Sequence, residues 1–165
     1  MRSEGQTPAL QSVVSAGVNH DVVRFEPAGT IIDAAARRGI PVGALVKTMV
    51  VRRSSDDFTL VLVPGDRVID WVRLRNHLGV RRLSLASDAE ALTATGYRPG
   101  TITPLGVDRN LAVVADAALA GAGRVSVGAG VPGVAVHLDA ADLLELTGAV
   151  VGEVTKPAGF SPGES

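Results

Sequence analysis

The chain has 165 residues, of which 46% are hydrophobic and 20% are charged, a composition that fits a folded globular domain and excludes a disordered chain. A formal net charge of −1 argues against a broad surface that follows nucleic-acid phosphates. The absence of cysteine excludes disulfides, thiolate catalysis and cysteine-based zinc sites. No apolar run approaches the roughly 18 residues of a membrane span and no signal peptide opens the chain, so we expect a cytoplasmic protein with no membrane partner.

Helices are predicted where a capping residue stands before apolar residues at helical spacing. Thr7, Thr30 and Asp139 are such N-caps, because their side-chain oxygens can accept the first free N–H groups of a helix. Ser87 and Glu90 form a capping box. The predicted helices are residues 8–14, 31–38, 69–78, 88–95 and 140–147.

Short valine- and leucine-rich segments predict strands. They are residues 22–25, 45–51, 58–63, 82–85, 110–115, 124–127, 134–138 and 150–154, the last as an edge strand. The polar sequence RRSSDD between the second and third strands predicts an antiparallel hairpin. Short connections favour mostly antiparallel pairing, so the predicted fold is one α+β domain with a mixed, mostly antiparallel sheet and surrounding helices.

The predicted domain covers residues 21–154. Residues 1–20 are expected to form a leader with one short helix, and residues 155–165 a flexible C-terminal tail.

Residues 96–106, GYRPGTITPLG, are the most informative segment of the chain. Proline fixes φ, and glycine permits positive φ and close approach of a ligand, so this loop is expected to be rigid and to carry binding or catalysis. A simple surface turn is the alternative. The second glycine-rich turn, residues 128–133, has no helix after it and is therefore no dinucleotide site. It is either a hairpin loop or a second wall of the same pocket.

Lys47 lies within an apolar strand, on the face of Leu45, Met49 and Val51. An ammonium there must reach solvent, pair with an anion or occupy a site; the alternative is an edge-strand lysine that opposes aggregation. His137 lies in a strand directly after the glycine-rich turn, where an ordinary half-buried histidine is the simpler interpretation. No metal-ligand spacing, nucleophile elbow or P-loop is present, so no metal site is predicted.

Arginines occur in close pairs along the chain. Either they form a solvated surface balanced by the 17 acidic residues, or they make a local phosphate contact suited to the end of a nucleic acid. The pairs are Arg37 and Arg38, Arg52 and Arg53, Arg73 and Arg75, and Arg81 and Arg82.

Three motifs in order, VKTMVV, GYRPGTITPLG and VSVGAGVPGVAVHL, precede a terminal helix. This arrangement resembles the YbaK/prolyl-tRNA editing domain family over residues 21–154. The resemblance implies an α+β fold around a curved sheet and hydrolysis, in trans, of the ester in a mischarged aminoacyl-tRNA, with no metal or cofactor. The implied substrate is a small residue (alanine, cysteine or serine) on the tRNA for proline or cysteine.

The family's invariant lysine falls on Lys47, and the resemblance implies Lys47, Gly100 and Thr101 as the catalytic group. The substrate-binding residues that it implies are Thr48, Tyr97, Thr103, Gly106, Gly128, Gly130 and His137. Many relatives carry a serine around Gly128, where this chain departs from the pattern, so the amino acid stays open.

The expected partner is the acceptor end of an aminoacyl-tRNA, with an aminoacyl-tRNA synthetase as a further candidate. A non-catalytic module of the same fold, binding tRNA ends or a synthetase, is the alternative function. A small-molecule esterase is a weaker one, because the sequence shows no nucleophile.

Overall fold

The computed structural model describes residues 7–107 and 111–159. Its α-helices are α1 (Pro8–Ala16), α2 (Ile31–Arg38), α3 (Trp71–Leu78), α4 (Asp88–Thr95) and α5 (Ala140–Thr147), and its short 3-10 helices are η2 (Val42–Ala44) and η3 (Ala117–Leu119). Its strands are β1 (His20–Arg24), β2 (Val46–Ser54), β3 (Asp57–Pro64), β4 (Arg67–Ile69), β5 (Ser84–Leu85), β6 (Ala112–Asp116), β7 (Arg124–Gly128), β8 (Val134–Asp139), β9 (Val150–Gly152) and β10 (Thr155–Pro157).

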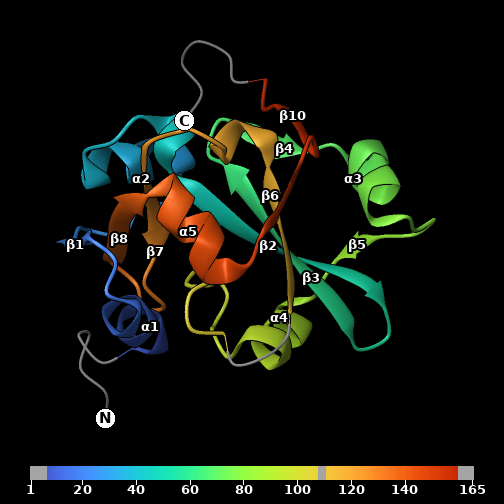
Figure 1. The fold of residues 1–165 in the computed structure, drawn as a ribbon, viewed down its shortest axis with the longest axis horizontal. Helices are drawn as coiled ribbons and strands as arrows, with labels where there is room; N and C mark the ends of the chain where they lie inside the picture. The colour runs from blue at the N-terminus through green and yellow to red at the C-terminus, as the bar shows by residue number, and fades with distance from the viewer. Residues whose placement is uncertain (1–6, 108–110, 160–165) are drawn as a thin grey trace.

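The strands of the described residues form three sheets (Figure 1). The five-stranded sheet has the order β5-β2-β3-β6-β9, with antiparallel pairs at β5-β2 and β2-β3 and parallel pairs at β3-β6 and β6-β9. The three-stranded sheet β1-β8-β7 and the two-stranded sheet β10-β4 are antiparallel. The predicted α+β class with mostly antiparallel pairing is therefore confirmed, although the strands are divided among sheets.

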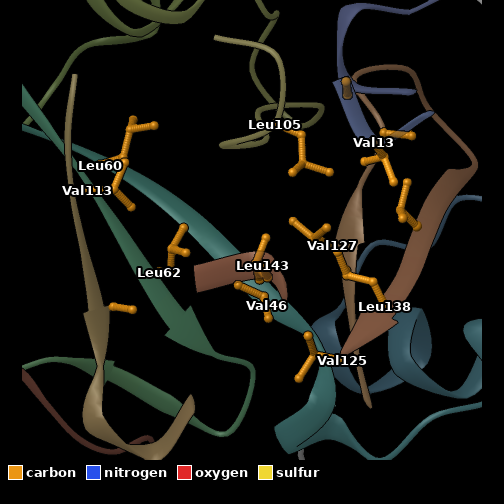
Figure 2. Close-up of a cluster of buried hydrophobic side chains, with 14 of the residues drawn as sticks. Val13, Val46, Leu60, Leu62, Leu105, Val113, Val125, Val127, Leu138 and Leu143 are labelled. Atoms are coloured by element: carbon orange, nitrogen blue, oxygen red, sulfur yellow. The ribbon is translucent and has the colours of Figure 1, made fainter. Parts of the chain in front are cut away.

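The main core lies between the five-stranded and three-stranded sheets. Figure 2 shows Leu62 from β3 and Val127 and Leu138 from β7 and β8 converging on Leu143 of α5. These side chains are fully buried, and burial of such a leucine or valine typically contributes about 1.5–3 kcal/mol. The two sheets also meet at a parallel bridge between Leu45 and Ser126.

The predicted helix caps are confirmed. The hydroxyls of Thr7 and Thr30 accept N–H bonds of 3.2 Å from Leu10 and Asp33. Ser87 and Glu90 form both bonds of the capping box, and Asp139 caps α5. Helix α1 belongs to the main core, because Ala9, Leu10 and Val13 are buried in it.

Two segments differ from the prediction at the edge of the fold. The helix expected from Ile69 begins at Trp71, because the Asp70 side chain accepts the N–H of Arg73 and thereby caps α3. Residues Arg67–Ile69 instead form β4, whose partner β10 (Thr155–Pro157) occupies the first residues of the expected tail. The last predicted strand ends early, at Gly152, and forms the edge of its sheet. Residues 1–6, 160–165 and Asn110, named in the predictions, lie outside the described residues.

Candidate active site

A pocket of about 500 Å³ lies where five segments of the chain meet. The first three segments are the residues after β1 (Phe25, Pro27 and Ala28), helix α2 (Ala34 and Arg38) and the start of β2 (residues 45–48). The other two are the glycine-rich segments, which contribute residues 99–102, Gly128 and residues 131–134. Among the described residues, Arg38 and Lys47 are the only charged ones in this lining, and most of the others are apolar. The pocket therefore combines a positive potential with apolar walls, and it brings together Lys47, Thr48, Gly100, Thr101 and Gly128 of the predicted site.

Lys47 is half-buried and lines the pocket, and its Nζ donates a 2.6 Å hydrogen bond to the carbonyl oxygen of Arg67 in β4. Burial lowers the pKa of Lys47, while the nearby Asp66 carboxylate raises it and so opposes the effect. An ammonium has three N–H donors, so two remain for a ligand. The carbonyl of Arg67 fixes the direction of the side chain.

The start of β2 is a sheet edge that faces the pocket. Within the described residues, the side of β2 away from β3 is covered at both ends: Leu45 bridges to Ser126, and the carbonyl of Val50 accepts a 2.9 Å bond from the N–H of Ala86. Between these points, residues 47–49 pair only with β3. The backbone groups on their other side are available to a ligand, as in other exposed strand edges. The hydroxyl oxygen of Thr48 is buried here and, among the described residues, finds no hydrogen-bond partner.

The loop of residues 96–106 is held from behind by three of the predicted binding residues. The Tyr97 hydroxyl donates a 2.6 Å bond to the carbonyl of Leu105, and the fully buried Thr103 accepts the N–H of Leu105. Gly106 has a φ of +71°, and a Cβ there would lie 2.4 Å from the backbone of Pro8 in α1. Tyr97, Thr103 and Gly106 do not line the 500 Å³ pocket; their observed contacts stabilise the loop.

At the tip of this loop, the backbone N–H groups of Gly100 and Thr101 differ in their hydrogen bonding. Thr101 uses both its N–H and its hydroxyl on the carbonyl oxygen of Arg98. Among the described residues no acceptor pairs with the N–H of Gly100, which has a φ of +87° and open space around it. Gly100 is therefore better placed than Thr101 to donate to a ligand.

The second glycine-rich segment contributes differently at its two predicted residues. Gly128 lines the 500 Å³ pocket at the end of β7. Gly130 has a φ of +90°, and a Cβ there would lie 2.6 Å from Cε1 of Tyr97. Gly130 and Tyr97 line an adjoining pocket of about 380 Å³, which shares Pro99, Thr101, Val131 and Pro132 with the first.

His137 lies outside the pocket lining. It faces Asp21 of β1 and Ser126 of β7 in the three-stranded sheet, and its Nε2 is buried without a partner among the described residues. Burial lowers its pKa, aided by the positive charges of Arg124 and Arg38 and opposed by Asp21. His137 therefore does not line the 500 Å³ pocket, where the predicted binding role would require it.

Arg38 is a charged residue of the pocket that the sequence analysis named only as one of an arginine pair and not as part of the predicted site. Its guanidinium stacks over the Phe25 ring at 4.8 Å from the centroid and donates a 3.1 Å bond to the hydroxyl of Ser126. Burial lowers its pKa, and its Nε is buried without a partner among the described residues. The pair Arg37 and Arg38 was the sequence feature that could have indicated this residue, but the sequence did not reveal which of the two arginines faces the pocket.

Two kinds of feature, a metal-binding cluster and a membrane-spanning helix, are absent from the described ranges, residues 7–107 and 111–159. No group of three or more histidine, aspartate or glutamate side chains there could hold a metal ion. No helix in these ranges is long and apolar enough to cross a membrane.

Residues 25–146 match the aminoacyl-tRNA editing domain family. The chain belongs to this family, and the resemblance noted from its motifs is confirmed.

The proline–tRNA ligase of Trichlorobacter lovleyi is 38% identical over 90 residues, which cover 54% of this chain and 16% of the ligase. The proline–tRNA ligase of Pelobacter propionicus is 31% identical over 100 residues, 61% of this chain and 17% of the ligase. The chain thus corresponds to a small part of these longer proteins. A solved structure described as a "putative trans-editing enzyme for prolyl tRNA synthetase" has a TM-score of 0.82 and 26% identity, covering 94% of this chain and 99% of that one.

Proposed function

We propose that this chain is an aminoacyl-tRNA deacylase that acts in trans. Its substrate would be a small amino acid (alanine, cysteine or serine) attached wrongly to the tRNA for proline or cysteine. Membership of the editing family supports this proposal. The observation that carries it is the pocket in which the Lys47 ammonium, the open edge of β2 and the Gly100 loop face one cavity.

The reaction places the aminoacyl ester between β2 and the tip of the loop. Attack on an ester creates negative charge on the carbonyl oxygen, and one well-placed N–H donor to such an oxygen contributes roughly 3–4 kcal/mol. The free N–H of Gly100 and the ammonium of Lys47 are the two donors that we assign to this oxygen.

Water is the nucleophile that we assign to this mechanism. Among the described residues, the pocket lining contains no cysteine, serine or histidine; the Thr101 hydroxyl is bonded to the carbonyl of Arg98, and no base contacts the Thr48 hydroxyl. The oxygen of water bonds to the ester carbon, and the bond from that carbon to the ribose oxygen breaks. The neighbouring ribose hydroxyl of the tRNA takes the proton from water and passes its own proton to the departing ribose oxygen. The products are the free amino acid and an uncharged tRNA.

The arginine pairs support a nucleic-acid partner. Five arginines border one groove of about 680 Å³, namely Arg52, Arg53, Arg75, Arg81 and Arg82. Glu90 and Asp57 neutralise part of this charge through ion pairs with Arg52 at 3.3 Å and Arg53 at 3.9 Å. Arg52 follows Lys47 by five residues along β2, about 17 Å at the rise of a strand. An acceptor end whose ester lies in the pocket would bring its phosphates to this groove.

The test is deacylation of a panel of mischarged tRNAs by the wild type and by Lys47→Met. Methionine keeps the apolar stem and removes the ammonium, so kcat/KM should fall at least 100-fold, the scale of a lost oxyanion donor. Arg73→Met is the matched control, because Arg73 is an exposed cation of α3 that pairs only with Asp70 among the described residues. It should retain activity within about twofold.

The proposal is contradicted if the wild type leaves the whole panel intact while a known editing domain clears it. Binding of uncharged tRNA without turnover would then favour a non-catalytic module. Equal activities of Lys47→Met and Arg73→Met would retain a deacylase but remove Lys47 from its mechanism.

A further inference from the structure

A further cavity, about 340 Å³ in volume, lies beside Lys47. Lys47 also lines the 500 Å³ pocket, which we call the editing pocket. We call the further cavity the Trp71 pocket. It is lined by Lys47, Met49, Val63, Val68, Ile69, Trp71, Leu85 and Lys156. Six of these residues are apolar, two are lysines, and none is acidic.

The Trp71 pocket exists because β4 and β10 pair beside the start of β2. Lys156 of β10 pairs with Val68 of β4, and Trp71 follows at the first position of α3. Two apolar residues of this lining are exposed, Val68 at 38% and Leu85 at 51%.

The chemistry of this lining suits a flat, aromatic group that carries negative charge nearby. Proteins that bind single-stranded nucleic acid combine aromatic side chains, on which bases stack, with cations that contact the backbone phosphates. Trp71 supplies such a ring, and Lys47 and Lys156 supply the cations. An acidic residue would repel the phosphates, and none lines the pocket.

The position of the Trp71 pocket connects it to the editing pocket and to the arginine groove. Lys47 lines both this pocket and the editing pocket, and its bond to the carbonyl of Arg67 holds it at the boundary. On the other side, Leu85 of the Trp71 pocket is followed back along β5 by Ser84, which lines the arginine groove. A strand of RNA could therefore pass from the arginine groove over the Trp71 pocket to the ester beside Lys47.

We propose that the Trp71 pocket binds a nucleobase of the single-stranded 3′ end of RNA, with Lys47 and Lys156 at the flanking phosphates. This inference rests on the proposed function for the identity of the RNA. It adds a binding site on the far side of Lys47.

Trp71 is the single tryptophan of the chain, so its fluorescence reports on this pocket without any turnover. Titration of the wild type with the unacylated oligonucleotide 5′-ACCA-3′ should give saturable quenching. An abasic oligonucleotide with the same phosphates should quench weakly. Lys156→Met should raise the Kd about threefold or more, and Arg73→Met should leave it unchanged.

A second measurement uses a fluorescently labelled 5′-ACCA-3′ and its anisotropy, which does not depend on the tryptophan. Trp71→Leu should weaken binding about five- to one-hundred-fold, the range for loss of one stacked base. Trp71→Phe, which keeps an aromatic ring, should recover part of the affinity. Unchanged melting temperatures of the variants would show that the fold is intact.

Equal binding of the intact and abasic oligonucleotides, or wild-type affinity in Trp71→Leu, would overturn the nucleobase site. Such a result is compatible with active deacylation, so it would leave the proposed function standing. Quenching by 5′-ACCA-3′ together with no deacylation of any mischarged tRNA would uphold the nucleobase site and reject the deacylase.

Discussion

The buried hydroxyl of Thr48 gives a prediction in which stability and activity change in opposite directions. Thr48 lines the editing pocket, and its buried Oγ1 has no partner among the described residues. A buried polar group without a hydrogen bond costs about 1–3 kcal/mol. Thr48→Val replaces the hydroxyl with a methyl group of similar shape, so the free energy of unfolding should rise by about 1 kcal/mol. For a domain of this length, that raises the melting temperature by about 2–4 °C.

The same substitution should lower activity, because we expect the substrate to supply the partner that Thr48 lacks. Loss of one such hydrogen bond, about 1 to 1.5 kcal/mol, reduces kcat/KM about five- to tenfold. The assays are thermal unfolding followed by circular dichroism and deacylation of the substrate identified in the panel.

Thr59→Val is the matched control. Thr59 is fully buried in β3, and its Oγ1 also lacks a partner among the described residues, but it does not line the pocket. It should gain the same stability with no change in activity. If the melting temperature falls for Thr48→Val and rises for Thr59→Val, the conclusion that the Thr48 hydroxyl is unpaired is wrong. If Thr48→Val keeps full activity, the proposed contact between this hydroxyl and the substrate is wrong.

Three further predictions concern the loop support, the buried histidine and the arginine groove. Gly130→Ala should destabilise the protein by about 2 kcal/mol or more, measured by thermal unfolding, because its Cβ would lie 2.6 Å from the Tyr97 ring at a φ of +90°. Burial lowers the pKa of His137 below its ordinary 6.5, so its stabilising contribution is complete above that pH and is lost as the pH falls below it; His137→Gln should flatten this acid-side loss in pH-dependent unfolding. The double variant Arg81→Ala and Arg82→Ala should reduce the slope of log K against log salt for uncharged tRNA by about 1.8, if both arginines neutralise duplex phosphates.

Each of these has a control in the chain. Gly100→Ala also has a positive φ but meets nothing within 4 Å, and it should cost less stability than Gly130→Ala. His77→Gln, at an exposed histidine of α3, should not change the acid-side loss. Arg73→Ala should keep the wild-type salt slope; an equal fall in that slope would show that the groove arginines hold no special position.

Local signals predicted the helices well, because a cap is decided by a few neighbouring residues. Thr30 and Ser87 bind the N–H groups that their positions in the sequence indicate. Strand β4 escaped prediction because Ile69 continues an apolar pattern at helical spacing into α3, and its partner β10 lies almost ninety residues away. The parallel pairing of β3 with β6 likewise depends on a long connection, and its register cannot be obtained from either segment alone.

The sequence predicted the parts of the candidate site that lie within recognisable motifs. Lys47 and Gly100 line one pocket, as the motif order implied. The motif could not separate residues that face the pocket from those that support it, such as Tyr97 and Gly106, because rigid loops need both. The sequence did not place Arg38 at the pocket, because the orientation of its side chain depends on tertiary contacts with Phe25 and Ser126.

The contact between Gly106 and α1 bears on where this protein can be cut or fused. The family match begins at residue 25 and stops at residue 146, so a fragment with those limits lacks α1, β1, β9 and β10. It would release the backbone of Pro8 from Gly106 at one side of the loop and remove Lys156 and the partner of β4 at the other. A portable version of this domain, for fusion to another protein, therefore needs at least residues 7–157.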